Sequence, residues 1–403
     1  MITVFDASCL ASQPPRQTAA PTAPAREPLL AGGPPRPRAV PSATVLVSGR
    51  SVETWNDEFF RQLRRRHNVP DGFLNTDKEH SVDLKAARAE SKLGKGGETQ
   101  HVSRDAKFIV KSVSGDDHKA LLERAQAYVE RLLTGASLLV PIYLHFRDPS
   151  TKKVYIAMRN LTPEVTWDEK YDLKGCADDK TLLWKGEMIE PVHKRFYRAD
   201  MWSRCMWTKK RHVYYDGKVR ARALHFDFPT TQRNEIVRRL HGDAEWLKRS
   251  GLMDYSLFVA IRRTRLKPQP AATPGNTKSE ASEASEAREA REATGNGGVG
   301  PETKILQQYA MLDGESMILV TLGIIDFLQP WTTAKKIARC IKSLEFNKAT
   351  IPPLAYADRF QRHFAERLRG EERLKPLDLA EVAVADNGAA HAWRELRESC
   401  ESP

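Results

Sequence analysis

The chain has 403 residues, of which 64 are Lys or Arg and 52 are Asp or Glu, so its formal net charge is +12 at pH 7. This length allows a substantial core even after segments of low complexity are set aside. The positive charge indicates an anionic partner, but it does not choose among lipid headgroups, nucleic acid and acidic proteins.

The five cysteines are scattered and never in CxxC spacing, which indicates neither a disulfide framework nor a zinc site. The longest apolar run, residues 317–328, contains Asp326 and is shorter than the ~20 residues of a membrane-spanning helix. The N-terminus lacks the order of a secretory signal. We therefore expect a protein of the reducing cytosol, with peripheral membrane contact.

Residues 1–50 are rich in Pro, Ala, Ser and Arg, which is typical of a disordered tail. Trp55, Phe59, Phe60 and Leu63 then recur at helical spacing before three arginines, which predicts an amphipathic helix with a basic end. That end could face a membrane or could simply be solvated.

A glycine cluster that includes Gly94 and Gly97 precedes the apolar run 108–111, which ends in Lys111. We predict a strand, a turn and a strand here. A glycine-rich turn can lie over a triphosphate because no side chain blocks its backbone N–H groups, although such clusters are usually plain loops.

Residues 117–133 carry one apolar stripe at helical spacing, and residues 137–146 and 154–158 are predicted to be paired strands. Further on, residues 196–222 alternate aromatic and basic side chains around a predicted hairpin turn at Asp216 and Gly217. That alternation suits nucleic acid but also ordinary exposed strands, and we favour the latter. Helical stripes follow at 236–247 and 356–368.

Residues 252–261 and 318–328 are short apolar runs that predict buried strands, and each carries one carboxylate, Asp254 and Asp326. A carboxylate in such a place needs a cation. Two aspartates at strand ends with a lysine on a third strand, Lys111, form a constellation that can hold Mg²⁺ and ATP phosphates. Between them, residues 267–303 repeat Ser, Glu, Ala and Arg without an apolar face, which predicts a linker.

The amino-acid sequences of four segments are more specific than this pattern of charges. Residues 108–114 (FIVKSVS), 171–175 (YDLKG), 253–262 (MDYSLFVAIR) and 323–331 (GIIDFLQPW) resemble, in order, the signature segments of the phosphatidylinositol phosphate kinase family. The resemblance covers residues 55–364. It implies an α+β, two-lobed lipid-kinase fold distantly like protein kinases, with an antiparallel sheet in the N-lobe and a mixed α/β C-lobe.

The predicted organisation follows from this resemblance and from the composition. It consists of a disordered tail (1–50), an ATP-grasping N-lobe (51–162), the first part of the C-lobe (163–266), a disordered insertion (267–303), the second part of the C-lobe with an activation segment (304–370) and a C-terminal tail (371–403).

By resemblance, the chain transfers the γ-phosphate of ATP to the inositol ring of a phosphatidylinositol monophosphate, with Mg²⁺ as the metal. Lys111 would contact the α- and β-phosphates, Asp326 would bind Mg²⁺, and Asp254 would orient or deprotonate the attacking hydroxyl. Further residues expected to bind the nucleotide are Gly94 and Gly97 in the glycine loop and Met158, Asn160 and Leu161 in the hinge.

Lys174 and Lys180 are the candidates for the substrate phosphate, because an ammonium suits a phosphomonoester. Lys335 and Lys336 match paired lysines that the family uses to reach the membrane and its lipid. Ala338 falls where the branch acting on the 5-phosphate carries alanine, whereas branches acting on the 4-phosphate carry glutamate. The resemblance also implies the cytoplasmic face of a membrane, the plasma membrane foremost, and allows a homodimer.

Some positions depart from the family. Glu98 lies in the glycine loop, Cys176 replaces a serine, Asp117 replaces a glutamate that pairs with the lysine, and residues 224–228 keep only part of a motif. These departures motivate an alternative, a catalytically degenerate scaffold that binds phosphoinositides. A protein kinase is disfavoured because neither an HRD-type catalytic loop nor a DFG motif is present.

Overall fold

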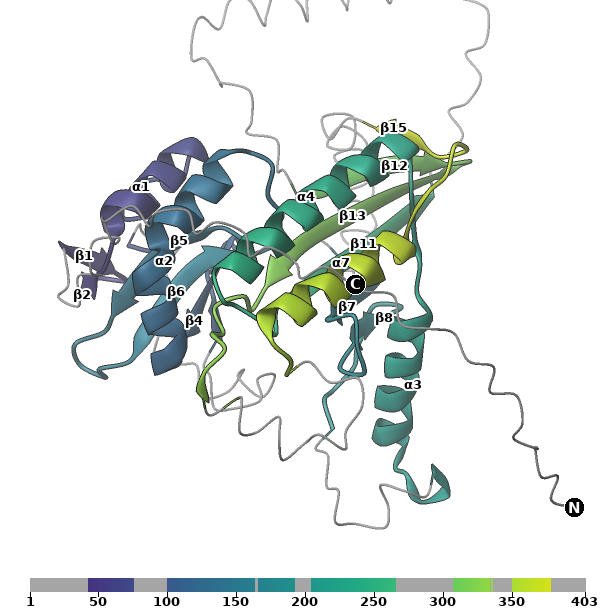
Figure 1. Cartoon of the computed structure of the whole chain (residues 1–403), viewed down its shortest axis with the longest axis horizontal. Helices are drawn as coiled ribbons and strands as arrows, with labels where there is room; N and C mark the ends of the chain where they lie inside the picture. Colours follow the sequence, from purple (N-terminus) through teal and green to yellow (C-terminus); the bar gives the residue numbers. More distant parts are fainter. Residues whose placement is uncertain are drawn as a thin grey trace, which may run out of the picture. The chain divides into compact units, whose positions relative to one another are not determined.

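Figure 1 shows the computed structural model of the chain. The structure describes residues 43–75, 100–163, 166–192, 204–265, 307–333, 335 and 350–377, which all belong to one compact unit. They form two large antiparallel sheets, a short parallel strand pair and the helices packed on them, so the fold is α+β, as predicted. In this described part of the chain, no helix is long and apolar enough to cross a bilayer.

The first sheet has six strands in the order β1-β2-β5-β6-β4-β3. In β4, Phe108 and Val110 are buried, whereas Ile109 and Lys111 are only partly covered. Because successive side chains of a strand point to opposite faces, Lys111 lies on the face away from that core. The strands are β1 Ala43–Val47, β2 Arg50–Thr54, β3 Gln100–Val102, β4 Phe108–Ser112, β5 Ile142–Arg147 and β6 Val154–Arg159.

Helices α1 (Asp57–Arg66) and α2 (Gly115–Leu133) lie side by side next to this sheet (Figure 1). In α1 the predicted apolar stripe is buried at Phe60 and Leu63. Helix α2 begins where the Ser114 hydroxyl accepts a hydrogen bond from the Asp117 backbone N–H, which caps the helix. Both predicted helices are therefore confirmed.

Two predicted boundaries are wrong. Strand β1 begins at Ala43, inside the range expected to be a disordered tail, and it turns into β2 through Ser48 and Gly49, which both have positive φ. Such a two-residue turn matches the twist of antiparallel strands and fixes their register. At the other end, β15 (Lys375–Leu377) joins the second sheet within the range expected to be a C-terminal tail.

The second sheet has seven strands in the order β15-β12-β13-β11-β7-β8-β9. The two long strands β11 and β13 pair over ten residues near its middle, and Leu257, Val259, Leu322 and Ile324 are fully buried there, as predicted for these runs. The remaining bounds are β7 Glu169–Leu173, β8 Lys180–Trp184, β9 Glu187–Met188, β11 Ser256–Arg265, β12 Gln308–Asp313 and β13 Ser316–Ile325.

Helices α4 (Thr230–Arg249) and α7 (Pro353–Arg367) run side by side across one face of this sheet (Figure 1). The predicted stripes are buried in both, with Phe360 and Phe364 among the largest fully buried side chains of α7. The chain leaves α7 directly into β14 (Leu368–Gly370), which pairs in parallel with β10 (Phe226–Phe228).

The predicted hairpin around Asp216 and Gly217 is wrong. A short 3₁₀ turn (Arg204–Met206) leads into α3 (Lys209–Ala223), which contains both residues and packs on β8. Gly217 allows this close packing, because a Cβ there would lie 3.3 Å from Ile189 Cδ1. The Thr181 hydroxyl also donates a 2.7 Å hydrogen bond to the Gly217 carbonyl. Tertiary contact therefore overrides the local turn signal.

Residues 138–140 join the two sheets. The Val140 N–H donates to the Ile324 carbonyl at 3.0 Å, and the Ile324 N–H donates to the Leu138 carbonyl at 2.7 Å. The Gln307 side-chain amide also donates to the Leu138 and Leu139 carbonyls. The segment leading into β5 is therefore hydrogen-bonded to β13 two residues before Asp326.

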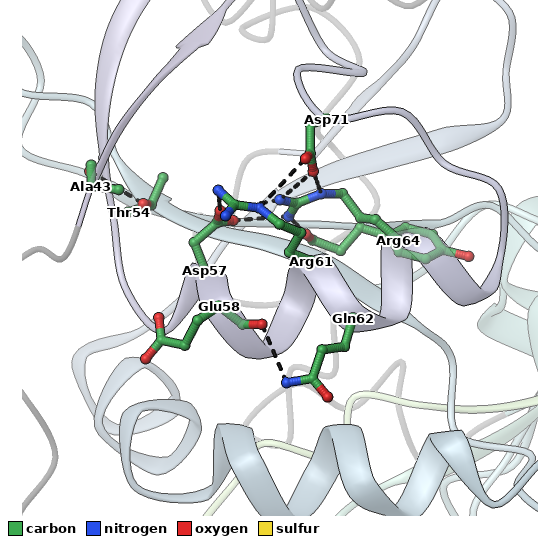
Figure 2. Close-up of polar contacts among 9 residues, drawn as sticks. Ala43, Thr54, Asp57, Glu58, Arg61, Gln62, Arg64 and Asp71 are labelled. Atoms are coloured by element: carbon green, nitrogen blue, oxygen red, sulfur yellow. Dashed lines mark hydrogen bonds and ion pairs between the residues drawn. The ribbon is translucent and has the colours of Figure 1, made fainter.

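Four charged residues, Asp57, Arg61, Arg64 and Asp71, form what we call the α1 charge cluster (Figure 2). Arg64 donates to both oxygens of Asp57, at 2.8 and 3.1 Å, to Asp71 and to the Tyr143 carbonyl. Only 3% of the Arg64 and Asp57 side chains is exposed. A cavity of about 160 Å³ lies beside them, and its charged walls are these same paired groups.

Candidate functional site

The two aspartates predicted to act together lie at the same end of neighbouring strands. Ser256, the first residue of β11, is paired with Ile325, the last residue of β13. Asp254 precedes β11 by two residues and Asp326 directly follows β13. The antiparallel register therefore brings both carboxylates to one edge of the second sheet, which we call the aspartate edge.

Both aspartates have left-handed backbone conformations, with φ of +65° at Asp254 and +57° at Asp326. Most L-residues avoid this region, and Asp is among the side chains that tolerate it. The conformation ends the regular strand at each residue, so neither side chain follows the alternation of the strand into the core. Unusual backbone at a carboxylate is a common feature of functional sites.

Lys111 of β4 reaches the aspartate edge from the other sheet. Its Nζ lies 2.9 Å from Asp326 Oδ1. The pair is open to solvent, with 21% of the lysine and 46% of the aspartate side chain exposed. An ion pair of this kind is worth little to stability and can exchange its partners for ligand groups. The predicted convergence of Lys111 and Asp326 is therefore present.

Lys174 follows the end of β7, which pairs with β11 on the side opposite β13. Its Nζ forms an ion pair with the Asp254 carboxylate and donates a 2.7 Å hydrogen bond to the Asp254 carbonyl. Burial alone would lower the pKa of Lys174, but the charges of Asp254 and Asp172 outweigh burial and raise this pKa. The lysine therefore stays charged beside Asp254.

Lys180, at the start of β8, lies 2.6 Å from the buried Asp172 carboxylate. Burial would raise the pKa of Asp172, but the charges of Lys180 and Lys174 hold it below its usual value. One third of the Lys180 side chain remains exposed. Asp172 thus pairs directly with Lys180, and the charge of Lys174 also acts on it. The sequence did not reveal this role, although Asp172 and Lys174 are two residues apart within the YDLKG segment.

Gln329 and Lys335 complete the edge. The Gln329 amide lies between Asp254 Oδ2 and Lys335 Nζ, at 2.8 Å from each when its nitrogen faces the carboxylate. Lys335 also donates to the Pro330 carbonyl at 3.2 Å, and the Met253 N–H donates to the Gln329 carbonyl at 3.0 Å. The start of the segment after β13 is therefore docked against Asp254. Gln329 belongs to the segment 323–331 noted in the sequence, but only the three-dimensional structure shows its partners.

The predicted hinge follows β6. The Asn160 N–H donates to the Lys107 carbonyl at 2.8 Å, and its side-chain amide donates to the Ala106 carbonyl at 2.6 Å. Leu161 lies on β13 at Gly323, where an added Cβ would come 2.4 Å from Leu161 Cδ1. Met158 remains only partly covered. The hinge is therefore fixed to both sheets, and a side chain at position 323 would push Leu161 away.

Other predicted site residues have a different outcome. Gly94, Gly97, Lys336 and Ala338 lie outside the described residues. Asp117 stands where the family has the glutamate that pairs with the lysine. It accepts a 2.8 Å hydrogen bond from the Ser114 hydroxyl at the start of α2, whereas Lys111 lies 2.9 Å from Asp326.

Among the described residues, no group of three or more His, Cys, Asp or Glu side chains is gathered as a ready metal site. Mg²⁺ needs none, because it is commonly held by one or two carboxylates together with substrate phosphates and water. The exposed Asp326 beside Lys111 fits that mode of binding. The aspartate edge thus has the carboxylates and cations that phosphoryl transfer requires.

Comparison with known proteins agrees with this chemistry. The sequence model of the phosphatidylinositol-4-phosphate 5-kinase family matches residues 82–367. The chain belongs to this family of phosphatidylinositol phosphate kinases. The resemblance predicted from the four segments is therefore confirmed.

Individual relatives are distant. A human phosphatidylinositol 4-phosphate 5-kinase type-1 beta is 25% identical over 331 residues, covering 77% of this chain and 56% of the relative. A chicken phosphatidylinositol 5-phosphate 4-kinase type-2 alpha is 24% identical over 328 residues, covering 75% and 74%. A phosphatidylinositol 4-phosphate 5-kinase of Schizosaccharomyces pombe is 28% identical over 173 residues, covering 42% and only 21%. The chain thus spans between a fifth and three quarters of these relatives, which include kinases of both regiochemistries.

Proposed function

We propose that the chain transfers the γ-phosphate of ATP to a ring hydroxyl of a phosphatidylinositol monophosphate and so produces phosphatidylinositol 4,5-bisphosphate. The observation that carries the proposal is the pairing at the aspartate edge, where Lys111 meets Asp326 and Lys174 meets Asp254. Family membership supports the same reaction.

On the nucleotide side, Lys111 binds the α- and β-phosphates, and Asp326 holds Mg²⁺ through its exposed carboxylate. The metal supplies neutralisation of the charge that develops on the transferred phosphoryl group. When ATP arrives, the phosphate oxygens replace Asp326 as the partner of Lys111. Met158, Asn160 and Leu161 bind the adenine through the hinge, and the loop with Gly94 and Gly97 covers the phosphates.

On the lipid side, Asp254 accepts a hydrogen bond from the attacking hydroxyl and takes its proton as the new bond to phosphorus forms. Lys174 holds the carboxylate in place through the Asp254 carbonyl and side chain. Lys174 and Lys180 are the cations for the phosphate already on the ring, and Lys335 is linked to Asp254 through Gln329. Positioning and charge neutralisation then carry the reaction.

The remaining features concern the membrane and the substrate isomer. We propose that basic residues, including Lys335 and Lys336, hold the protein on the anionic cytoplasmic leaflet of the plasma membrane, where each cation contributes about 1 kcal/mol. Ala338 favours the 5-phosphate substrate by the family pattern. Homodimerisation and the division into lobes and linkers stand as part of the same proposal.

The test is transfer of labelled phosphate from Mg-ATP to vesicles that contain phosphatidylinositol 4-phosphate or phosphatidylinositol 5-phosphate. The wild type should form product, and Asp326→Asn should reduce kcat about 10³-fold, because the charge that binds the metal is lost. A matched control is Asp313→Asn. Asp313 lies on the same sheet beside Ser316, at the opposite end of β13, and is paired with Arg373. That variant should keep full activity.

The results distinguish the two substrate isomers from each other and the kinase from the scaffold. Product from the 5-phosphate lipid alone supports the Ala338 argument, and product from the 4-phosphate lipid overturns that argument while keeping the kinase. A folded wild type that binds these vesicles but yields no product would replace the enzyme with the phosphoinositide-binding scaffold.

A further inference from the structure

A short loop, residues 174–179, connects β7 to β8 at the aspartate edge and is closed by one buried carboxylate. The side chain of Asp179 is fully buried. Its Oδ1 accepts hydrogen bonds from the Lys174 N–H at 2.6 Å and the Cys176 N–H at 3.2 Å, and the Gly175 N–H contributes as well. Three successive backbone N–H groups therefore converge on a single carboxylate of the same loop.

Helix α7 covers this loop. Gly175 has a φ of +69°, and a Cβ at this position would lie 3.1 Å from His363 Cγ. The second oxygen of Asp179, Oδ2, lies 3.7 Å from His363 Nε2, and within the described residues neither atom has a hydrogen-bond partner. The loop is thus held from inside by Asp179 and from outside by the His363 ring.

Burial is the largest influence on the pKa of both His363 and Asp179. Burial and the charges of Arg367 and Arg359 lower the pKa of His363 to about 4, so this ring is neutral at pH 7. Burial raises the pKa of Asp179, while the loop N–H groups and Arg367 act in the opposite direction. The N–H groups of the loop are therefore the nearest compensation for the carboxylate.

Convergent backbone N–H groups commonly bind phosphate from outside. Here Asp179 already occupies them, so a substrate phosphate has to be recognised by side chains. Two lysines lie at the ends of the loop closed by Asp179. Lys174 is its first residue, and Lys180 directly follows Asp179. Both have their ammonium groups at the aspartate edge, on Asp254 and Asp172. The closed loop therefore fixes the spacing of the two backbone positions from which these cations extend.

We propose that Asp179 is a positioning residue for the lipid substrate, holding Lys174 and Lys180 at the spacing that one phosphomonoester requires. The inference rests on the proposed function, because it concerns the lipid side of that same site. It assigns to Asp179 the preference for phosphatidylinositol that already carries a ring phosphate over unphosphorylated phosphatidylinositol. ATP binding, on the opposite side of the site, does not depend on it.

The test compares Asp179→Asn with Asp148→Asn. Asp148 is also a buried aspartate that caps a tight turn, accepting from the Ser150 N–H at 2.9 Å and the Ser150 hydroxyl at 2.7 Å, but its turn connects β5 to β6. The two substitutions should lower the free energy of unfolding by similar amounts. Only Asp179→Asn should raise the KM for the phosphorylated lipid, by about ten- to a hundredfold as for other groups that orient a ligand-binding side chain. The KM for ATP should stay unchanged.

A second variant and a vesicle-binding measurement test the same inference independently. His363→Gln changes the outer support on the surface of α7 and should raise the same lipid KM by a smaller factor, also if Asp179→Asn does not fold. If the wild type forms no lipid product, the proposed function fails, and the loop is tested by co-sedimentation with vesicles containing phosphatidylinositol 4-phosphate or only phosphatidylcholine. Weaker phosphoinositide-dependent binding by Asp179→Asn supports the inference. Equal lipid KM or equal binding in the Asp179 and Asp148 variants overturns it.

Discussion

The chain contains two clusters that pair aspartates with basic side chains, the α1 charge cluster with arginines and the aspartate edge with lysines. In the α1 charge cluster, Arg64 is held by both oxygens of Asp57, by Asp71 and by a backbone carbonyl, and it is almost completely buried. At the aspartate edge, Lys111 and Asp326 meet in a solvent-exposed pair.

The difference shows how burial and geometry separate a structural role from a functional one. A buried, bidentate arginine with satisfied donors cannot release a partner without leaving a charge in a low-dielectric core. A partly exposed lysine and a half-exposed carboxylate on left-handed backbone can both exchange partners for phosphate or metal at little cost. Counting charges in the sequence would not distinguish these two clusters.

The largest expected effect tests the buried cluster. Arg64→Met should lower the free energy of unfolding by about 3 kcal/mol, because it leaves the buried Asp57 with only the more exposed Arg61. Arg61→Met is the matched control, since Arg61 contacts the same two aspartates but has 44% of its side chain exposed. It should cost less than about 1 kcal/mol. Equal losses in denaturant unfolding would remove the distinction between the clusters.

The next effect tests the aspartate edge through its ligand. Mg-ATP at 100 times its Kd should raise the free energy of unfolding of the wild type by about 2.7 kcal/mol. Asp326→Asn should lose this increment, whereas Arg64→Met should keep it although its starting stability is lower. Thermal unfolding with and without Mg-ATP measures both. An increment that survives in Asp326→Asn would place the metal elsewhere.

The smallest effect concerns the stability of the exposed pair itself. Lys111→Met should change the free energy of unfolding by less than about 1 kcal/mol without ligand, because the pair with Asp326 is screened by solvent. The same variant should lose the stabilisation by Mg-ATP. A loss as large as that of Arg64→Met would mean that Lys111 serves the fold as well as the ligand.

The sequence was informative where one strand carries both its own signal and its own functional group. Asp254 and Asp326 could be identified because each interrupts a β-branched apolar run, and the antiparallel pairing of β11 and β13 then brings them together. Asp179 and Gln329 gave no such signal. Their roles depend on partners such as His363 and Lys335, which only the tertiary structure brings within reach.

Helix α3 shows a second limit. Asp216 and Gly217 form a strong local turn signal, yet both lie inside the helix, because Gly217 lets α3 approach β8 closely. For the missed strand β1, the local signal was too weak rather than misleading. Its first four residues are mostly exposed and do not alternate between apolar and polar side chains. Its pairing with β2 stabilises it. In both cases a partner element, absent from any local window, decides the conformation.

The hydrogen bonds between residues 138–140 and Ile324 also have a mechanical consequence. They act as a pivot, because the backbone of the segment entering β5 is fastened to the strand that ends at Asp326. If the first sheet moved towards the second, it would have to rotate about these hydrogen bonds or break them. A rotation about these hydrogen bonds would change the distance between Lys111 and Asp326, whereas the backbone beside Ile324 would stay in place.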